Sequence, residues 1–301
     1  MSEQPVPDRP GRQRPAPSFG QEDRQGIGMS HYLPMPVVEI GDGTAPLPTT
    51  RGTFAAPAHV LDAEGRLETG MLASLTDSIG GMTSGLACLP DWIVTTNLSL
   101  RRSPDALQGP RGTGDLVIDT QVMRRGRSSA VTRSTVRDGA GDAVATSWIT
   151  CAILTPAGGP PPFIRPVTLN DHALSTDPLF RLSPTEFFGI EAGEVPGVLL
   201  LHPAEHLRNP WGILHGGSVA HLLDTAARSV VAGRREPGPT PGIIVSDLVI
   251  HYMNPGRDGP ILARASIVGR AGDDVMVRVT AHDRGADDRL MNVAVMTVRV
   301  L

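Results

Sequence analysis

The chain has 301 residues, of which 40% are hydrophobic and 19% are charged, and its formal net charge is −4 at pH 7. These values are typical of a globular protein with one large domain or two of ordinary size. The small negative charge gives no general attraction to nucleic acid, and every apolar run is shorter than the roughly 20 residues of a membrane span.

The first half of the chain begins with a polar segment and continues with one helix and several strands. Residues 1–30 are rich in Pro, Gly, Arg, Gln and Asp, which predicts a disordered tail, and residues 34–40 favour a short extended entry. A helix is expected at 70–85, because apolar residues recur on one side of it. Turn signals of the Arg-Arg-Gly and Asp-Gly type separate four expected strands, at 93–100, 116–123, 129–136 and 143–154.

The second half repeats this order after a proline-rich segment. A strand cannot continue through Pro-Ala-Gly-Gly-Pro-Pro-Pro, so we interpret residues 156–183 as a linker that wraps loosely over the surface. A spacing of 147 residues places Gly70 on Gly217 and Asp77 on Asp224. The expected elements are extended segments at 187–190 and 198–202, a helix at 217–232, and strands at 243–252, 261–269, 275–282 and 290–300.

One helix followed by four strands, twice, predicts an α+β fold made of two repeats, residues 31–155 and 184–301. The loops between strands are too short for parallel crossovers, so each sheet should be antiparallel and wrap its central helix. A repeat alone would expose a sheet edge and half of its helix. Two repeats side by side can join their sheets edge to edge into one continuous sheet.

The second repeat carries a cluster of polar residues and glycines around the start of its helix. The helix begins near Gly217, and its first N–H groups have no partner inside the helix, so they can receive an oxygen that becomes anionic. Asp224 lies two turns further on the same face, and Asn209 precedes the glycines. This combination favours acyl chemistry, although a loop, a glycine cap and a capping histidine would give the same pattern.

Asn209, His215-Gly216-Gly217 and Asp224 resemble the signature of hotdog-fold acyl-CoA thioesterases of the phenylacetyl-CoA thioesterase type. The resemblance covers residues 184–301 and extends to the first repeat through the duplication. It implies a tandem chain, or double hotdog, with coenzyme A entering only as part of the substrate. It implies no nucleic-acid or membrane partner, and it leaves open a homo-oligomer of double hotdogs.

In that family the active sites lie between two units whose central helices run antiparallel. Carried over, one site joins Asp77 to the motif of the second repeat, namely Asn209, His215, Gly216 and Gly217. In the other site, Asp224 faces Asp62 and Glu68, where the family has Asn and His. We expect these carboxylates to repel an anionic transition state, so that one site works, the other is degenerate, and loss of the Asp224 charge is harmless or stabilising.

The roles implied for the working site follow from thioester hydrolysis. Asp77 is a general base or a nucleophile, and the sequence does not separate the two. Asn209 orients substrate or water, and the N–H of Gly216 or Gly217 receives the oxyanion. His215 fixes the loop or contacts the substrate.

Basic residues are expected to bind the phosphates of coenzyme A, although solvated loop arginines would look the same. The candidates are Arg101, Arg102, Arg124, Arg125 and Arg127.

Other chemistries find less support. His202 and His206 do not complete a zinc site with His215, and the two cysteines, Cys88 and Cys151, lack metal-type spacing, so we expect no metal. With no apolar N-terminal segment to indicate a signal peptide, we expect a cytoplasmic protein. Two alternatives stay open: a double-hotdog acyl-CoA dehydratase or hydratase, and a non-catalytic acyl-CoA-binding protein.

Overall fold

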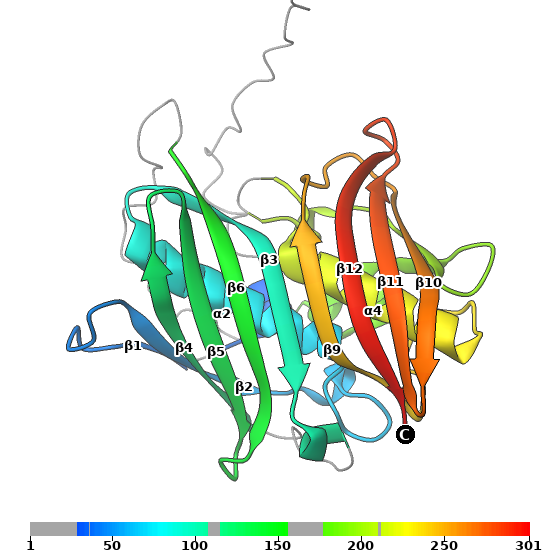
Figure 1. The fold of residues 1–301 in the computed structure, drawn as a ribbon, viewed down its shortest axis with the longest axis horizontal. Helices are drawn as coiled ribbons and strands as arrows, with labels where there is room; N and C mark the ends of the chain where they lie inside the picture. Colours follow the sequence, from blue (N-terminus) through cyan, green and yellow to red (C-terminus); the bar gives the residue numbers. More distant parts are fainter. Residues whose placement is uncertain (1–28, 36, 108–114, 156–176, 210–211) are drawn as a thin grey trace, which may run out of the picture.

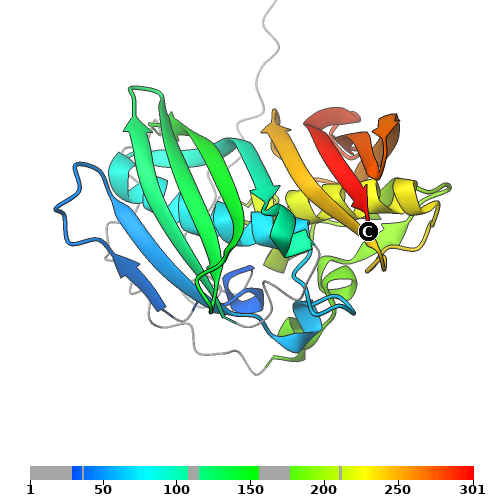
Figure 2. The same cartoon turned by 60° about the horizontal axis from the view of Figure 1, so that its bottom comes forward.

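The computed structural model describes residues 29–35, 37–107, 115–155, 177–209 and 212–301. The expected disordered tail, up to residue 28, and most of the expected linker lie outside the described residues. Within the described part, the strands form one antiparallel sheet in the order β1-β2-β4-β5-β6-β3-β9-β12-β11-β10-β8-β7 (Figure 1). Both long helices lie on the same face of this sheet (Figures 1 and 2). The predicted α+β class and antiparallel sheet are therefore confirmed.

The first half contains one long helix, α2 (Thr69–Cys88), against its part of the sheet. A short helix, α1 (Met29–Tyr32), precedes it. The strands of this half are β1 (Val37–Ile40), β2 (Thr49–Ala55), β3 (Trp92–Arg102), β4 (Asp115–Arg125), β5 (Ser129–Asp138) and β6 (Ala143–Leu154), and the 3₁₀ turns are η1 (Ala58–Val60) and η2 (Pro104–Leu107).

The second half has the same order around helix α4 (Gly216–Ala232). A short helix, α3 (Pro184–Phe188), and two 3₁₀ turns, η3 (Pro178–Arg181) and η4 (Glu205–Leu207), belong to its entry. Its strands are β7 (Ile190–Ala192), β8 (Val198–Leu201), β9 (Ile243–Tyr252), β10 (Ile261–Ala271), β11 (Asp274–Asp283) and β12 (Arg289–Val300).

Three sequence predictions differ from this structure. The segment 187–190 was expected to be extended, but Phe187 and Phe188 form the end of helix α3, because Ser183 and Glu186 form a capping box and Gly189 closes the helix in the left-handed conformation. Strand β2 was not predicted. The end of the expected linker does not wrap loosely, since Phe180 is buried in the core.

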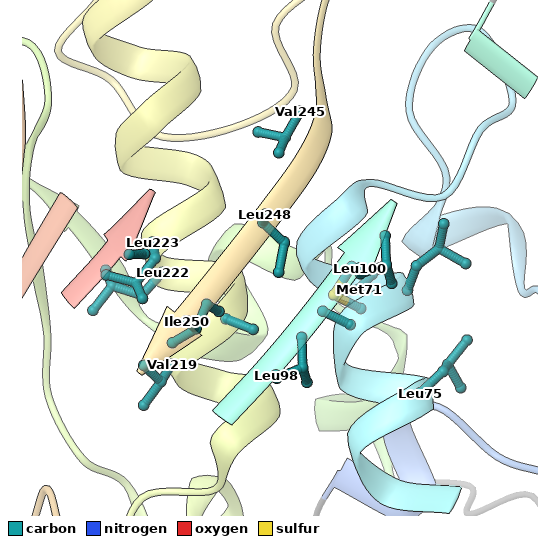
Figure 3. Packing of buried hydrophobic residues seen from close by; sticks show 14 of the residues in the cluster. Met71, Leu75, Leu98, Leu100, Val219, Leu222, Leu223, Val245, Leu248 and Ile250 are labelled. Carbon is teal, nitrogen blue, oxygen red and sulfur yellow. The ribbon is translucent and has the colours of Figure 1, made fainter. Parts of the chain in front are cut away.

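The two halves join through β3 and β9, which pair antiparallel from Asn97↔His251 to Arg101↔Asp247. Inward-facing side chains along this junction are fully buried and lie beside both helices, as Figure 3 shows for Leu98, Leu100, Leu248 and Ile250. Burial of each such side chain contributes roughly 1.5–3 kcal/mol to folding. The core therefore runs across the junction without a break.

Helices α2 and α4 cross in direct backbone contact. A Cβ on Gly70 would lie 2.6 Å from the His221 Cα, and a Cβ on Gly217 would lie 2.7 Å from the Ser74 Cβ. The start of each helix thus lies against the second turn of the other, so the helices run antiparallel. Neither helix, nor any other among the described residues, is long and apolar enough to cross a membrane.

We predict that residues 184–301 do not fold into a stable monomer alone. Without the first half, the β3-facing edge of β9 and the α2-facing side of α4 would both be uncovered. The fragment should aggregate or form a homodimer, measured by light scattering beside the full chain. A well-behaved monomer would contradict the dependence of one half on the other.

Candidate active site

The first turn of α4 is capped by a histidine. The His215 side chain accepts a hydrogen bond at Nδ1 from the Gly217 N–H, at 2.9 Å. A neutral imidazole that accepts at Nδ1 carries its proton on Nε2, which fixes the tautomer. The Gly217 N–H is consequently occupied. Of the two glycines that the sequence offered as oxyanion donors, Gly216 is therefore the better candidate.

Asp77 projects from the middle of α2 toward this turn. It is 6% exposed. Its Oδ1 accepts a hydrogen bond of 2.8 Å from the Thr95 hydroxyl on β3. Its Oδ2 lies 3.7 Å from His215 Nδ1. One carboxylate oxygen is therefore held by a hydroxyl, and the other faces the start of α4.

Gly216 allows the carboxylate to lie close to the start of the helix. A Cβ at this position would lie 2.6 Å from Asp77 Oδ2, so any side chain here would force the carboxylate to move. In the described part of the chain no hydrogen bond occupies the Gly216 N–H. This N–H lies at the positive end of the α4 dipole and can receive an oxygen that becomes anionic.

Tyr252, at the end of β9, also reaches this turn. Its hydroxyl donates a hydrogen bond of 2.9 Å to the Gly216 carbonyl. Burial raises the pKa of Tyr252 well above its usual value, and the nearby Asp77 charge acts in the same direction. The hydroxyl therefore stays protonated and acts as a donor.

Asn209 lies in the turn that precedes α4. Its backbone N–H donates to the Ile213 carbonyl at 2.8 Å, and its Oδ1 accepts from the Ile213 N–H at 3.3 Å. Of the three residues between, Pro210 and Trp211 lie outside the described part. The contact of Asn209 with a substrate stays a prediction.

The pseudo-equivalent position around Asp224 is built differently. Glu68 lies at the N-cap of α2, as His215 does in α4. The expected repulsion between Glu68 and Asp224 is offset by Arg228, which lies 2.9 Å from a carboxylate oxygen of each. Burial raises the pKa of both carboxyl groups, and Arg228 lowers it. The remaining expected member, Asp62, pairs with Arg66 at 3.0 Å.

Arg228 also closes this position to a substrate. It lies one turn after Asp224, where α2 has Gly81 one turn after Asp77. A Cβ at Gly81 would meet no atom within 4 Å, so no side chain fills the equivalent position in α2. Beside Arg228 and Glu68 there is a cavity of about 10 Å³, which holds at most one water molecule.

Glu68, His221 and Asp224 also form a buried group with the spacing of metal ligands. The buried carboxylates Glu68 and Asp224 already pair with Arg228, and Arg102 lies close to both charges. A divalent cation would add uncompensated positive charge in a buried region. This donor set fits an ion-pair cluster better than a metal site.

The arginines expected at the entrance for coenzyme A separate into three groups. The prediction for Arg102 is wrong, because it is 3% exposed and donates two hydrogen bonds to the Leu67 carbonyl. Burial lowers its pKa to about 10. Arg101 is exposed and pairs with Asp247 across the junction at 2.7 Å. The exposed side chains near the β4–β5 turn, whose role stays a prediction, are those of Arg124, Arg125 and Arg127.

The sequence does not single out Thr95, Tyr252 or Arg228. For Arg228 a signal exists, because a cation four residues after a helical carboxylate usually pairs with it. For Thr95 and Tyr252 no local signal exists, since each reaches its partner through the packing of a strand against a helix.

Comparisons with known proteins agree with this architecture. Residues 212–288 match the family model of the Thioesterase superfamily, and no match was found among curated proteins. One similar solved structure is a candidate oleoyl thioesterase from Lactobacillus plantarum (TM-score 0.59, 12% identity, 85% of this chain and 98% of the other). Another is an acyl-ACP thioesterase from Bacteroides thetaiotaomicron (TM-score 0.54, 13% identity, 83% of this chain and 98% of the other). A third is a protein with a hot dog fold from Alicyclobacillus acidocaldarius (TM-score 0.54, 13% identity, 91% of this chain and 97% of the other). At these identities the likeness shows the fold alone, which is the hotdog fold.

We predict that Asp224→Asn destabilises the protein, contrary to the expectation from the sequence. Removal of one partner from a buried ion pair costs roughly 3–5 kcal/mol, and Glu68 still pairs with Arg228, so the loss should be about 2 kcal/mol. Urea unfolding measures it, with Asp247→Asn as the control for an exposed pair. Unchanged or higher stability would mean that repulsion dominates after all.

A second prediction concerns acid stability. Burial lowers the pKa of His221 to about 3, so the unfolded chain binds a proton there between about pH 6.5 and 3 and the folded chain does not. Stability from this group is complete above pH 6.5 and falls on acidification. At pH 4.5 the loss of stability is about 3 kcal/mol, and His221→Gln should remove it.

The measurement is the free energy of unfolding at pH 7 and pH 4.5 in both proteins. His251→Gln, a change at an exposed histidine, is the matched control. An equal pH dependence in the wild type and His221→Gln would contradict a neutral buried imidazole.

Proposed function

We propose that this chain is an acyl-CoA thioesterase that hydrolyses an acyl-CoA thioester to a free acid and coenzyme A. We also propose that the chain is a double hotdog of the phenylacetyl-CoA thioesterase type, in which residues 31–155 and 184–301 are the two repeats and one working active site lies between them. It rests on one observation. The carboxylate of Asp77 from one half lies against the Gly216 backbone, at the start of the helix of the other half.

The thioester carbonyl oxygen binds at the Gly216 N–H. As a nucleophile adds to the carbonyl carbon, negative charge develops on this oxygen, and the N–H and the helix dipole stabilise it. A single donor of this kind contributes roughly 3–4 kcal/mol to the transition state. Because Gly216 has no Cβ, the donor and the Asp77 carboxylate can lie this close together.

Asp77 acts on the attacking group. With Oδ1 held by Thr95, Oδ2 is oriented toward the substrate side and takes a proton from water as the water oxygen bonds to the carbonyl carbon. When the tetrahedral intermediate collapses, the C–S bond breaks and the electron pair leaves with the thiolate of coenzyme A. If Asp77 attacks directly, an acyl-aspartate anhydride forms instead and water hydrolyses it.

The region around Asp224 does not serve as a second site in this proposal. Arg228 fills the position that carries no side chain at Gly81 in α2, and the remaining cavity holds no more than a water molecule. One active site for each chain follows.

A panel of acyl-CoA thioesters tests the function, with free thiol measured as it is released. Both cysteines of the protein are free but buried, so their own reaction with a thiol reagent should be slow. Steady release supports hydrolysis, hydration of an enoyl-CoA without thiol release supports the hydratase alternative, and binding without either supports a non-catalytic protein. The same acyl groups on pantetheine show whether the nucleotide of coenzyme A is needed.

We predict that Asp77→Asn lowers kcat by about 100-fold or more, because the amide keeps the size and the Thr95 contact but cannot take a proton. Asp119→Asn, which removes an exposed carboxylate paired with Arg51, is the control and should retain the full rate. Unfolding of both variants should resemble that of the wild type. Retention of turnover by Asp77→Asn would place the chemistry elsewhere.

A further inference from the structure

We propose that Tyr252 is a positioning residue of this active site, and that it acts on the oxyanion through the Gly216 peptide rather than by touching the substrate. This inference rests on the proposed function, because it concerns the same site. It adds a residue that neither the motif nor the duplication points to.

The contacts of Tyr252 lead into the oxyanion-binding turn. Its hydroxyl donates to the Gly216 carbonyl, the N–H of the same peptide unit belongs to Gly217, and that N–H donates to His215 Nδ1. A peptide unit that is bonded at both its oxygen and its nitrogen cannot rotate. The peptide unit that follows the Gly216 N–H in the first turn of α4 is therefore held from the β9 side.

Two residues of this chain of hydrogen bonds lie near Asp77. His215 Nδ1 is 3.7 Å from Asp77 Oδ2, and Gly216 packs directly against the same oxygen. The Gly216 N–H belongs to the preceding peptide unit and shares the Gly216 Cα with the 216–217 unit, so a displacement of that unit would shift the N–H relative to Asp77. The hydroxyl of Tyr252 should then affect the transition state more than substrate binding.

The other half of the molecule shows the structural alternative. Near the end of β3, Arg102 donates to the Leu67 carbonyl just before α2, and it lies close to the charge of Asp224. A donor from the junction strand thus holds the start of the helix in each half, which could serve folding alone. The test must separate stability from rate.

The chain contains one other tyrosine, and it provides a matched control. Tyr32 donates to the Leu182 carbonyl at 2.9 Å, the same kind of bond at the same length, within the aromatic cluster around Phe187. Tyr32→Phe and Tyr252→Phe each remove one hydroxyl that is bonded to a backbone carbonyl. Each variant is made in the full chain, and kcat, KM and Tm are measured with a short and a long acyl-CoA.

For Tyr252→Phe we expect kcat to fall roughly tenfold, less than the 100-fold or more that loss of the donor itself would cause, with KM unchanged within twofold. The factor should be the same for both chain lengths, because the hydroxyl acts at the thioester. Tyr32→Phe should lower Tm by a similar amount and leave kcat unchanged.

Two results would overturn the inference. An unchanged kcat with a lowered Tm would show a purely structural hydroxyl, and a raised KM with unchanged kcat would show a substrate contact. Asp77→Asn in the same experiment separates this from failure of the proposed function. If Asp77→Asn abolishes turnover and Tyr252→Phe leaves kcat unchanged, only the role of Tyr252 falls; if Asp77→Asn is fully active, the proposed site itself is wrong.

Discussion

The close crossing of α2 and α4 is the contact on which the rest of the structure depends. The crossing positions are glycines, and a Cβ at either one would lie under 3 Å from the other helix. At this separation the start of each helix reaches a carboxylate two turns into its neighbour. The pairing of β3 with β9 holds the two halves in this register. The candidate site and the core therefore both depend on how the two halves are joined.

The same geometry produces two different electrostatic environments. Asp77 meets a hydroxyl and the positive end of a helix dipole, which carries about half an elementary charge. Asp224 meets the full charge of Arg228 and lies near that of Arg102. A dipole and hydroxyls stabilise a carboxylate without filling the space beside it, whereas a guanidinium neutralises the charge and occupies the space. The first arrangement leaves the position one turn after the carboxylate without a side chain, and the second gives a buried ion-pair cluster.

Periodicity in the sequence predicts most of the long elements, because a helix that buries one side and strands that bury alternate residues leave strong patterns. Strand β2 escapes such reasoning, since Thr-Thr-Arg-Gly-Thr-Phe-Ala is polar and contains glycine. The glycine motif and the spacing of Asp77 and Asp224 identify the helix positions of the candidate site. They cannot identify Thr95 or Tyr252, whose contacts depend on how strand ends meet helices from far along the chain.

The two junction strands have the same backbone irregularity in both halves. Strands β3 and β9 each carry a bulge, at Thr96 and Ser246, where the register with the neighbouring strand shifts. In both bulges the hydroxyl donates to a carbonyl of that neighbour, Thr150 in one and Thr297 in the other. The bulges therefore belong to the fold, because they occur with the same bonding in both halves.

The residue before each bulge differs. Thr95 bonds to Asp77, whereas Val245 is apolar, and its backbone carbonyl accepts a hydrogen bond from Thr69. A bulge changes the direction of the side chains next to it. The residue before the bulge can therefore hold a carboxylate by a hydrogen bond when it is Thr95, which has a hydroxyl, and cannot when it is Val245, which has an isopropyl group. Asp224 has a guanidinium instead. The difference between the two positions thus lies in a few side chains set on a common backbone, which is why one half of the molecule can supply the carboxylate while the other supplies the helix start.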